Sequence, residues 1–188
     1  GSITSKLKIV SENVIGPKLG QENIRSGILA TIIGLSLVML FMLIWYKFSG
    51  LFADLALVLN LYLLLSILSV FHFTLTLPGI AGILLTIGMA VDANVLIFER
   101  IKEEIRNGKP ILSAVDEGYS KAFMTIFDAN LTTILAAIVL SQVGTGILKG
   151  FGVTLAVGIA CSMFTALVIS KLLIDVMVSI TKGKKIWI

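Results

Sequence analysis

One uncharged stretch, residues 55–91, decides the fold; it reads LALVLNLYLLLSILSVFHFTLTLPGIAGILLTIGMAV. Roughly 20 apolar residues are needed for a helix to cross a bilayer, so this stretch is long enough for two passes. Pro78-Gly79 lies near its middle and predicts a tight turn between them. Other uncharged stretches are residues 26–46, 129–148 and 150–170. The pattern predicts a chain that crosses a membrane several times.

Composition agrees with this interpretation. The chain is 57% hydrophobic and 14% charged, with a mean hydropathy of +1.03, whereas a soluble domain carries about 25% charged residues. Strands of a membrane barrel need about ten residues of alternating polarity, and these stretches are longer and uniformly apolar. We therefore expect an all-α polytopic membrane protein, a bundle of five transmembrane helices. The expected spans are residues 27–46, 55–73, 79–98, 125–143 and 147–169.

The segments outside the bundle, residues 27–181, have a different character. Residues 1–26 are interpreted as a tag scar, Gly1-Ser2, and a short strand left from an upstream periplasmic domain. Apolar residues recur at helical spacing from Leu112 through Val115 and Tyr119, which predicts an amphipathic helix over 110–124 on the cytoplasmic membrane face or against the bundle. Residues 182–188 form a basic tail.

Basic residues set the expected topology. The net charge is +4, and lysines and arginines gather between Arg100 and Lys121 and in the C-terminal tail. The positive-inside rule places these segments in the cytoplasm, and hence the N-terminus outside the cytoplasm. We interpret the basic residues as topology signals that contact lipid headgroups, and we expect no nucleic-acid binding.

Chemical motifs are sparse. The chain has one cysteine, Cys161, and one histidine, His72, which predict neither a disulfide nor a metal site. It has no phosphate-binding loop and no nucleophile placed beside a base. We expect a protein that is not an enzyme and that holds no cofactor or metal.

Asp92 is the residue that composition does not explain. It is the first charge after the uncharged stretch, within GMAVDANVLIFER, residues 88–100. A charge at the bilayer centre costs about 3 kcal/mol on insertion scales, so a partner, a water path or a proton has to compensate. Desolvation favours a neutral, protonated carboxyl group, which makes Asp92 a candidate proton carrier. The alternative is a structural carboxylate that is permanently hydrogen-bonded inside the bundle.

The neighbours of Asp92 extend this hypothesis. Gly88 and Glu99 share its helical face, and Gly88 leaves room for water or another helix. Asn94 turns to a different side, and Glu99-Arg100 mark the cytoplasmic end of the motif. The chain offers no lysine or arginine at the depth of Asp92. A pairing cation must then come from another chain, which predicts a hetero-complex.

The fourth expected span contributes further polar residues. Thr132 and Thr133 lie deep enough to hydrogen-bond across to Asp92 or Asn94, and Asn130 shares a face with Thr133. The alternative for both threonines is that they only help helices pack.

Two other sets of charges are interpreted as structural. Asp128 is expected near the cytoplasmic end of its span, as a charge at the start of a helix. Lys171 and Asp175 are one turn apart and are expected to form a pair near a helix end.

Residues 88–104, GMAVDANVLIFERIKEE, closely resemble the SecD subunit of the bacterial SecDF protein-export complex, of the RND superfamily. Supporting segments are IGPKLG (15–20), QENIRS (21–26), FDANLTT (127–133) and GTGILKGFGVT (144–154). The resemblance covers essentially the whole chain. The same family has a further transmembrane helix and a large periplasmic domain, which this sequence lacks.

The resemblance implies a fold, a role and partners. It implies an RND-type half-bundle in the bacterial inner membrane that uses the proton gradient to drive late preprotein translocation. Asp92 matches the family's proton-carrying aspartate, with pairing residues on SecF. The implied partners are SecF, the SecYEG channel, the SecA-driven preprotein and membrane lipid.

Two other functions remain open. One is half of an RND-type exporter of small molecules or lipids, which predicts two fused copies of this bundle with the charges in one chain. The other is a structural scaffold that conducts no protons, for which Asp92→Asn would change nothing.

Overall fold

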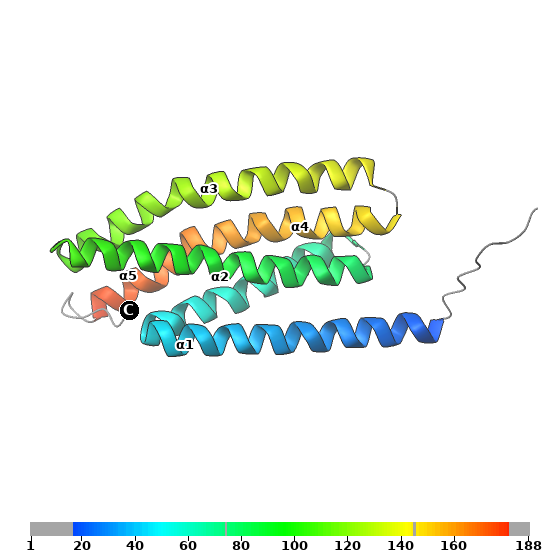
Figure 1. Ribbon diagram of the computed structural model, residues 1–188, viewed down its shortest axis with the longest axis horizontal. Helices are drawn as coiled ribbons and strands as arrows, with labels where there is room; N and C mark the ends of the chain where they lie inside the picture. The colour runs from blue at the N-terminus through cyan, green and yellow to red at the C-terminus, as the bar shows by residue number, and fades with distance from the viewer. Residues whose placement is uncertain (1–16, 74, 145, 181–188) are drawn as a thin grey trace, which may run out of the picture.

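The computed structural model describes residues 17–73, 75–144 and 146–180, and within these ranges the chain is helical apart from short connections (Figure 1). The elements are α1 (Pro17–Val70), α2 (Leu77–Arg106), α3 (Ile111–Val143), α4 (Gly146–Phe164), a π-helical turn η1 (Thr165–Ile169) and α5 (Ser170–Ile180). Four stretches are long and apolar enough to cross a membrane: Glu22–Val70, Leu77–Arg106, Ile111–Val143 and Leu148–Ile180. The all-helical membrane fold is confirmed at this level, but five separate helices are not.

Helix α1 accounts for the two spans predicted over 27–46 and 55–73. It reverses at Lys47, where φ is 49° and ψ is −119°, so that its second half returns along the bundle (Figure 1). The two halves meet closely, because a Cβ on Gly50 would lie 2.1 Å from the carbonyl oxygen of Met42. Only glycine allows this approach. The helix begins at Pro17, inside the segment predicted as a domain remnant, and the strand predicted there lies outside the described residues.

The turn predicted at Pro78-Gly79 is wrong by a few residues. The chain reverses before it, where His72 has a φ of 55°, and α2 starts at Leu77 with Thr76 as its N-cap. The Gly79 backbone N–H donates to Thr76 Oγ1 at 3.2 Å. Proline is acceptable in the first turn of a helix, where its missing N–H would have no intrahelical partner. The pair therefore opens a helix instead of forming the turn.

A separate amphipathic helix over 110–124 is also not confirmed. Helix α3 runs from Ile111 to Val143 without a break. Its N-terminal apolar stripe packs on the bundle, with Val115, Tyr119 and Ile126 buried, while Leu112 is 63% exposed. The stripe continues in register into the span, so the backbone has no reason to bend.

Helix α2 lies at the centre of the bundle, against α1, α3 and α4. Glycines of the neighbouring helices bring α3 and α4 close to it. A Cβ on Gly158 of α4 would lie 2.3 Å from Thr86 Cγ2, and one on Gly118 of α3 would lie 2.6 Å from Ile101 Cγ1. Small residues allow helices to approach this closely, and both glycines lie at such a contact with α2.

Gly158→Ala is expected to lower the free energy of unfolding by about 1–3 kcal/mol, because the new methyl group overpacks a contact with buried Thr86. Alanine alone would favour the helix by about 1 kcal/mol. The control is Gly88→Ala in α2, where an added Cβ meets nothing within 4 Å, and which should not destabilise the isolated chain. Thermal unfolding in detergent micelles measures both; equal midpoints would contradict the close packing of α2 and α4.

Candidate functional site

Asp92 lies on the outer surface of α2. Its side chain is exposed, as is Gly88 one turn before it, whereas Asn94 is buried at 3% exposure. A helix turns about 100° per residue, so Asp92 and Asn94 project to nearly opposite sides of α2. The sequence prediction that they face different neighbours is confirmed. The carboxylate is presented to whatever covers the bundle from outside.

A small cavity of about 120 Å³ lies beside Asp92, between α2 and α3. It is lined by Met89, Asp92, Ala93 and Leu96 from α2, and by Thr125, Ile126, Ala129 and Asn130 from α3. Asn130 Nδ2 donates to the carbonyl oxygen of Ile126 at 2.8 Å. The cavity thus brings Asp92 and Asn130 to one site, with room for a few waters.

Apolar side chains dominate the exposed surface of both helices. Leu85 of α2 is 47% exposed, and Leu135 and Val139 of α3 are 56% and 59% exposed. A carboxylate on such a surface would meet lipid or another protein in a membrane. Because a lipid-facing charge is costly, the arrangement favours a second protein over this face.

The predicted bonds of the threonines are wrong. The Thr133 hydroxyl donates to the carbonyl oxygen of Ala129 in its own helix, at 3.4 Å, and Thr132 is exposed. Neither crosses to α2. Asn94 Nδ2 likewise donates within its own helix, to the carbonyl oxygen of Ala90 at 3.1 Å.

The end of the motif binds other parts of the chain. Glu99 Oε1 accepts hydrogen bonds from the Tyr46 hydroxyl at 3.0 Å and from Lys102 Nζ at 3.1 Å. Lys102 Nζ also lies 4.4 Å from the centre of the Tyr46 ring. Glu99 therefore joins α2 to the first half of α1, while Arg100 pairs with Glu103 on the surface at 2.6 Å.

One carboxylate was placed wrongly by the sequence, and a second was missed. Asp128 is exposed near the middle of α3, between the cavity residues Ala129 and Ile126, and so at the level of Asp92. The other is Asp54, which belongs to α1 and is buried at 3% exposure.

Lys171 forms its close ion pair with Asp116 of α3, and with Asp175, its predicted partner, it has only a longer-range electrostatic attraction. Its Nζ lies 3.1 Å from Asp116 Oδ1 and 5.9 Å from the centre of the Tyr119 ring. The pair joins α5 to α3 instead of bridging one helical turn. No three His, Cys, Asp or Glu residues within the described ranges lie close enough together to hold a metal ion.

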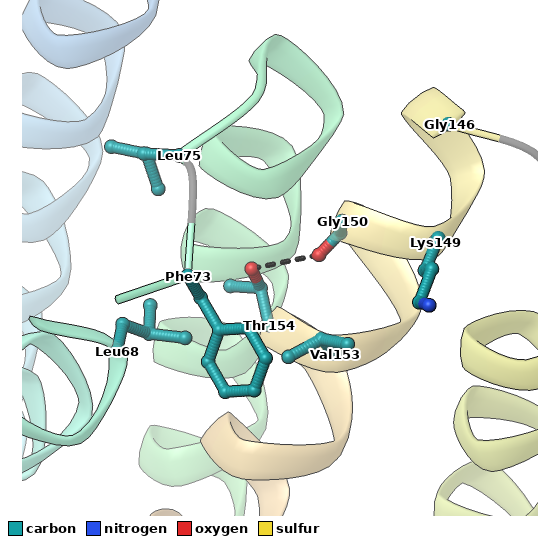
Figure 2. A pocket seen from close by; sticks show the side chains of 8 residues that line it. All are labelled: Leu68, Phe73, Leu75, Gly146, Lys149, Gly150, Val153 and Thr154. Atoms are coloured by element: carbon teal, nitrogen blue, oxygen red, sulfur yellow. Dashed lines mark hydrogen bonds between the residues drawn. The ribbon is translucent and has the colours of Figure 1, made fainter. Parts of the chain in front are cut away.

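A second cavity, of about 150 Å³, lies where the connection after α1 meets the start of α4 (Figure 2). Leu68, Phe73 and Val153 supply apolar walls, and the Thr154 hydroxyl donates to the carbonyl oxygen of Gly150 at 2.9 Å. Its lining contains no carboxylate. It is therefore distinct from the Asp92 site.

Residues 2–179 match the family described as protein export membrane protein SecD/SecF, C-terminal. The chain belongs to this family. Its SecD-family relatives include the protein translocase subunits SecD of Syntrophobacter fumaroxidans, 55% identical over 93% of this chain, and of Haemophilus influenzae, 52% identical over 100% of it.

Solved SecDF structures share the fold. SecDF from Thermus thermophilus, described as a translocon-associated membrane protein, superposes with a TM-score of 0.85 at 46% identity, over 88% of this chain and 23% of that one. SecDF in a super-membrane-facing form gives a TM-score of 0.81 at 45% identity, over 87% and 22%. The chain spans about a third of the curated relatives, 33% and 31% of their lengths. The predicted SecD resemblance is confirmed.

Proposed function

We propose that this SecD-family chain couples the proton gradient to late preprotein translocation across the bacterial cytoplasmic membrane. The observation that carries the proposal is the exposed Asp92 carboxylate, set beside a small cavity on an otherwise apolar helical surface. A carboxylate in that position is tolerable when it is neutralised or paired. A protein driven by protons needs a carboxyl group that alternates between a protonated, neutral state and a charged, paired state.

The proposed cycle begins when Asp92 takes a proton from the extracytoplasmic side. Its neutralisation changes the packing of α2 with α3 and α4, and release of the proton to the cytoplasm restores it. One proton crossing 100 mV yields about 2.3 kcal/mol. That shifts a two-state equilibrium by tens of times at most, so repeated cycles would drive each translocation event.

The proposed partner of the Asp92 face is SecF, which would supply the cation that pairs with the carboxylate. The SecYEG channel and SecA would deliver the preprotein, and membrane lipid would cover the remaining surface, with no role for nucleic acid. In this orientation the α2–α3 connection at 107–110 and the C-terminus face the cytoplasm, following the basic residues.

The two competing functions differ in what they require of Asp92. A half of a small-molecule or lipid exporter would respond to the gradient without any preprotein. A scaffold would need neither the proton nor the carboxylate. The exposed position of Asp92 favours a titrating group over a scaffold residue, because a scaffold gains nothing from a costly charge on that surface.

Inside-out membrane vesicles test the coupling directly. The full-length subunit with its partner is expected to accelerate the late phase of preprotein translocation only when a proton gradient is present. A protonophore should remove the acceleration, and vesicles that lack the subunit provide the baseline, because the channel itself can respond to the gradient. Acceleration that survives the protonophore would support the scaffold, and proton flux that ignores preprotein would support the exporter.

A further inference from the structure

A second intramembrane carboxylate lies inside the bundle. Asp54 of α1 is 3% exposed, and neither of its carboxylate oxygens has a hydrogen-bond partner in the described part of the chain. Buried polar atoms in proteins are nearly always hydrogen-bonded, so each exception calls for a cause. Both carboxylate oxygens of Asp54 are such exceptions.

Other buried polar atoms of α1 and α2 share the same deficit. Ser49 Oγ, Asn60 Oδ1 and Asn94 Oδ1 are buried without a hydrogen-bond partner among the described residues. Apart from the serine hydroxyl, these atoms and the Asp54 oxygens can only accept hydrogen bonds. What this interior lacks is a donor, and a proton on a carboxyl group is a donor.

Packing places Asp54 on the inner side of α2. Ala53 shares one buried cluster with Ala93, and Leu57 shares another with Ala90. Asn94, whose carbonyl oxygen is unpaired, projects to the same interior, while Asp92 projects to the opposite, outer side of α2. Helix α2 therefore separates two carboxylates.

The elements packed around Asp54 carry further charged and titratable groups. They include Tyr46 and Lys47 of α1, Asp92, Glu99 and Lys102 of α2, Cys161 of α4, and Lys171 and Asp175 of α5. Tyr46, Glu99 and Lys102 bond to one another, and Lys171 pairs with Asp116. Within the described ranges, none of these groups donates a hydrogen bond to Asp54.

We propose that Asp54 is a second proton-binding carboxylate of this chain, on the inner face of α2. An isolated charge in such an environment is so costly that the group stays neutral by binding a proton. The proton comes from the aqueous phase, one O–H bond forms on a carboxylate oxygen, and a hydronium ion becomes water. The protonated group can then donate to a neighbouring acceptor such as an unpaired amide oxygen.

This inference goes beyond the proposed function, which needs only Asp92. If Asp54 also exchanges its proton when α2 moves, the chain holds one proton acceptor on each side of the helix that carries the motif. Movement of α2 would then alter the surroundings of both carboxylates at once.

Infrared difference spectroscopy between acidic and alkaline pH tests the proposal in the full-length subunit with its partner. Carbonyl bands of protonated carboxyl groups are expected in the wild type. One of them should be retained in Asp92→Asn and missing from Asp54→Asn. Should Asp54→Asn not assemble, Asp54→Glu keeps a carboxyl group and should shift the band instead. Carbonyl bands that are all identical in wild type, Asp54→Asn and Asp54→Glu would overturn the assignment.

The same samples keep the two proposals separate. Loss of gradient-driven translocation in Asp92→Asn, together with no Asp54 band, would sink only the second site. An Asp54 band together with unchanged translocation in Asp92→Asn would sink the proposed function and leave the second site standing.

Discussion

Asp92→Asn in the full-length subunit, assembled with its partner, is expected to abolish the proton-gradient stimulation of translocation and to leave assembly intact. Asparagine has nearly the shape of aspartate, so the cavity shared with Asn130 should keep its form. The amide cannot bind and release a proton between the two compartments. Translocation with the gradient should fall to the rate of vesicles that lack the subunit, and co-purification of the partner measures assembly.

The matched control is Asp116→Asn, the same chemical change at an exposed carboxylate of α3. Asp116 is 69% exposed and pairs with Lys171 at 3.1 Å. An exposed ion pair is worth at most about 1 kcal/mol, so this variant should keep full stimulation. Full stimulation in Asp92→Asn as well would contradict the proton-carrier role and favour a scaffold.

Much of the fold follows from the sequence because lipid imposes simple requirements. Every backbone polar group in a bilayer must be satisfied within the chain, so uncharged runs such as residues 55–91 have to be helical. Asp92 could be singled out for the same reason, since a carboxylate in such a run needs a partner, a water path or a proton to compensate its charge. Gly158 could be expected at a helix contact, because small residues allow close helix packing in lipid.

The errors concern where helices begin and end. At a rise of 1.5 Å per residue, a helix of 33 residues such as α3 is about 50 Å long, well beyond a hydrocarbon core of about 30 Å. Hydropathy marks the apolar part but not the point where such a helix leaves the membrane. Asp128 was consequently assigned to a helix start, although it lies near the middle of α3.

The hydrogen-bond partners of side chains cannot be predicted from the sequence, for a different reason. Thr133 could bond across to α2 or back to its own helix, and the carbonyl four residues earlier is always within reach. The sequence does not contain the distance that decides between them. Asp54 was missed because the chain reverses tightly at Lys47, so that the residues that follow are buried in the bundle. No run of turn-forming residues in the sequence predicts this reversal.

The largest stability effect is expected at Glu104, where α2 leaves the bundle. Its carboxylate is only 1% exposed, and each of its oxygens is paired with a lysine. Lys109 Nζ lies 2.7 Å from Oε2, and Lys121 of α3 pairs with Oε1. The Lys109 backbone N–H also donates to the Glu104 carbonyl oxygen at 3.2 Å. These contacts join α2, the connection at 107–110 and α3.

Glu104→Gln removes the negative charge and leaves two ammonium groups beside a neutral amide. The loss of stability comes from the buried site itself, because the amide in place of the carboxylate no longer makes the charge-assisted hydrogen bonds to the two lysines. The thermal midpoint should fall by about 5–10 °C. Glu103→Gln is the control, since Glu103 is 54% exposed and pairs only with exposed Arg100, and it should change the midpoint little.

The pH dependence of unfolding gives an independent measure of the same cluster. The carboxylates of Glu104 and Glu117 raise the pKa of Lys109 above its ordinary value of 10.5. Because the raised pKa belongs to the folded state, the stabilisation is complete below 10.5 and is lost as the pH rises through the folded value. Lys109→Met should therefore lower the midpoint at pH 8 and show a smaller further loss at alkaline pH than the wild type. Parallel pH profiles for the wild type and Lys109→Met would mean that the cluster does not hold α2 to α3. The same conclusion would follow if the midpoint of Glu104→Gln were no lower than that of Glu103→Gln.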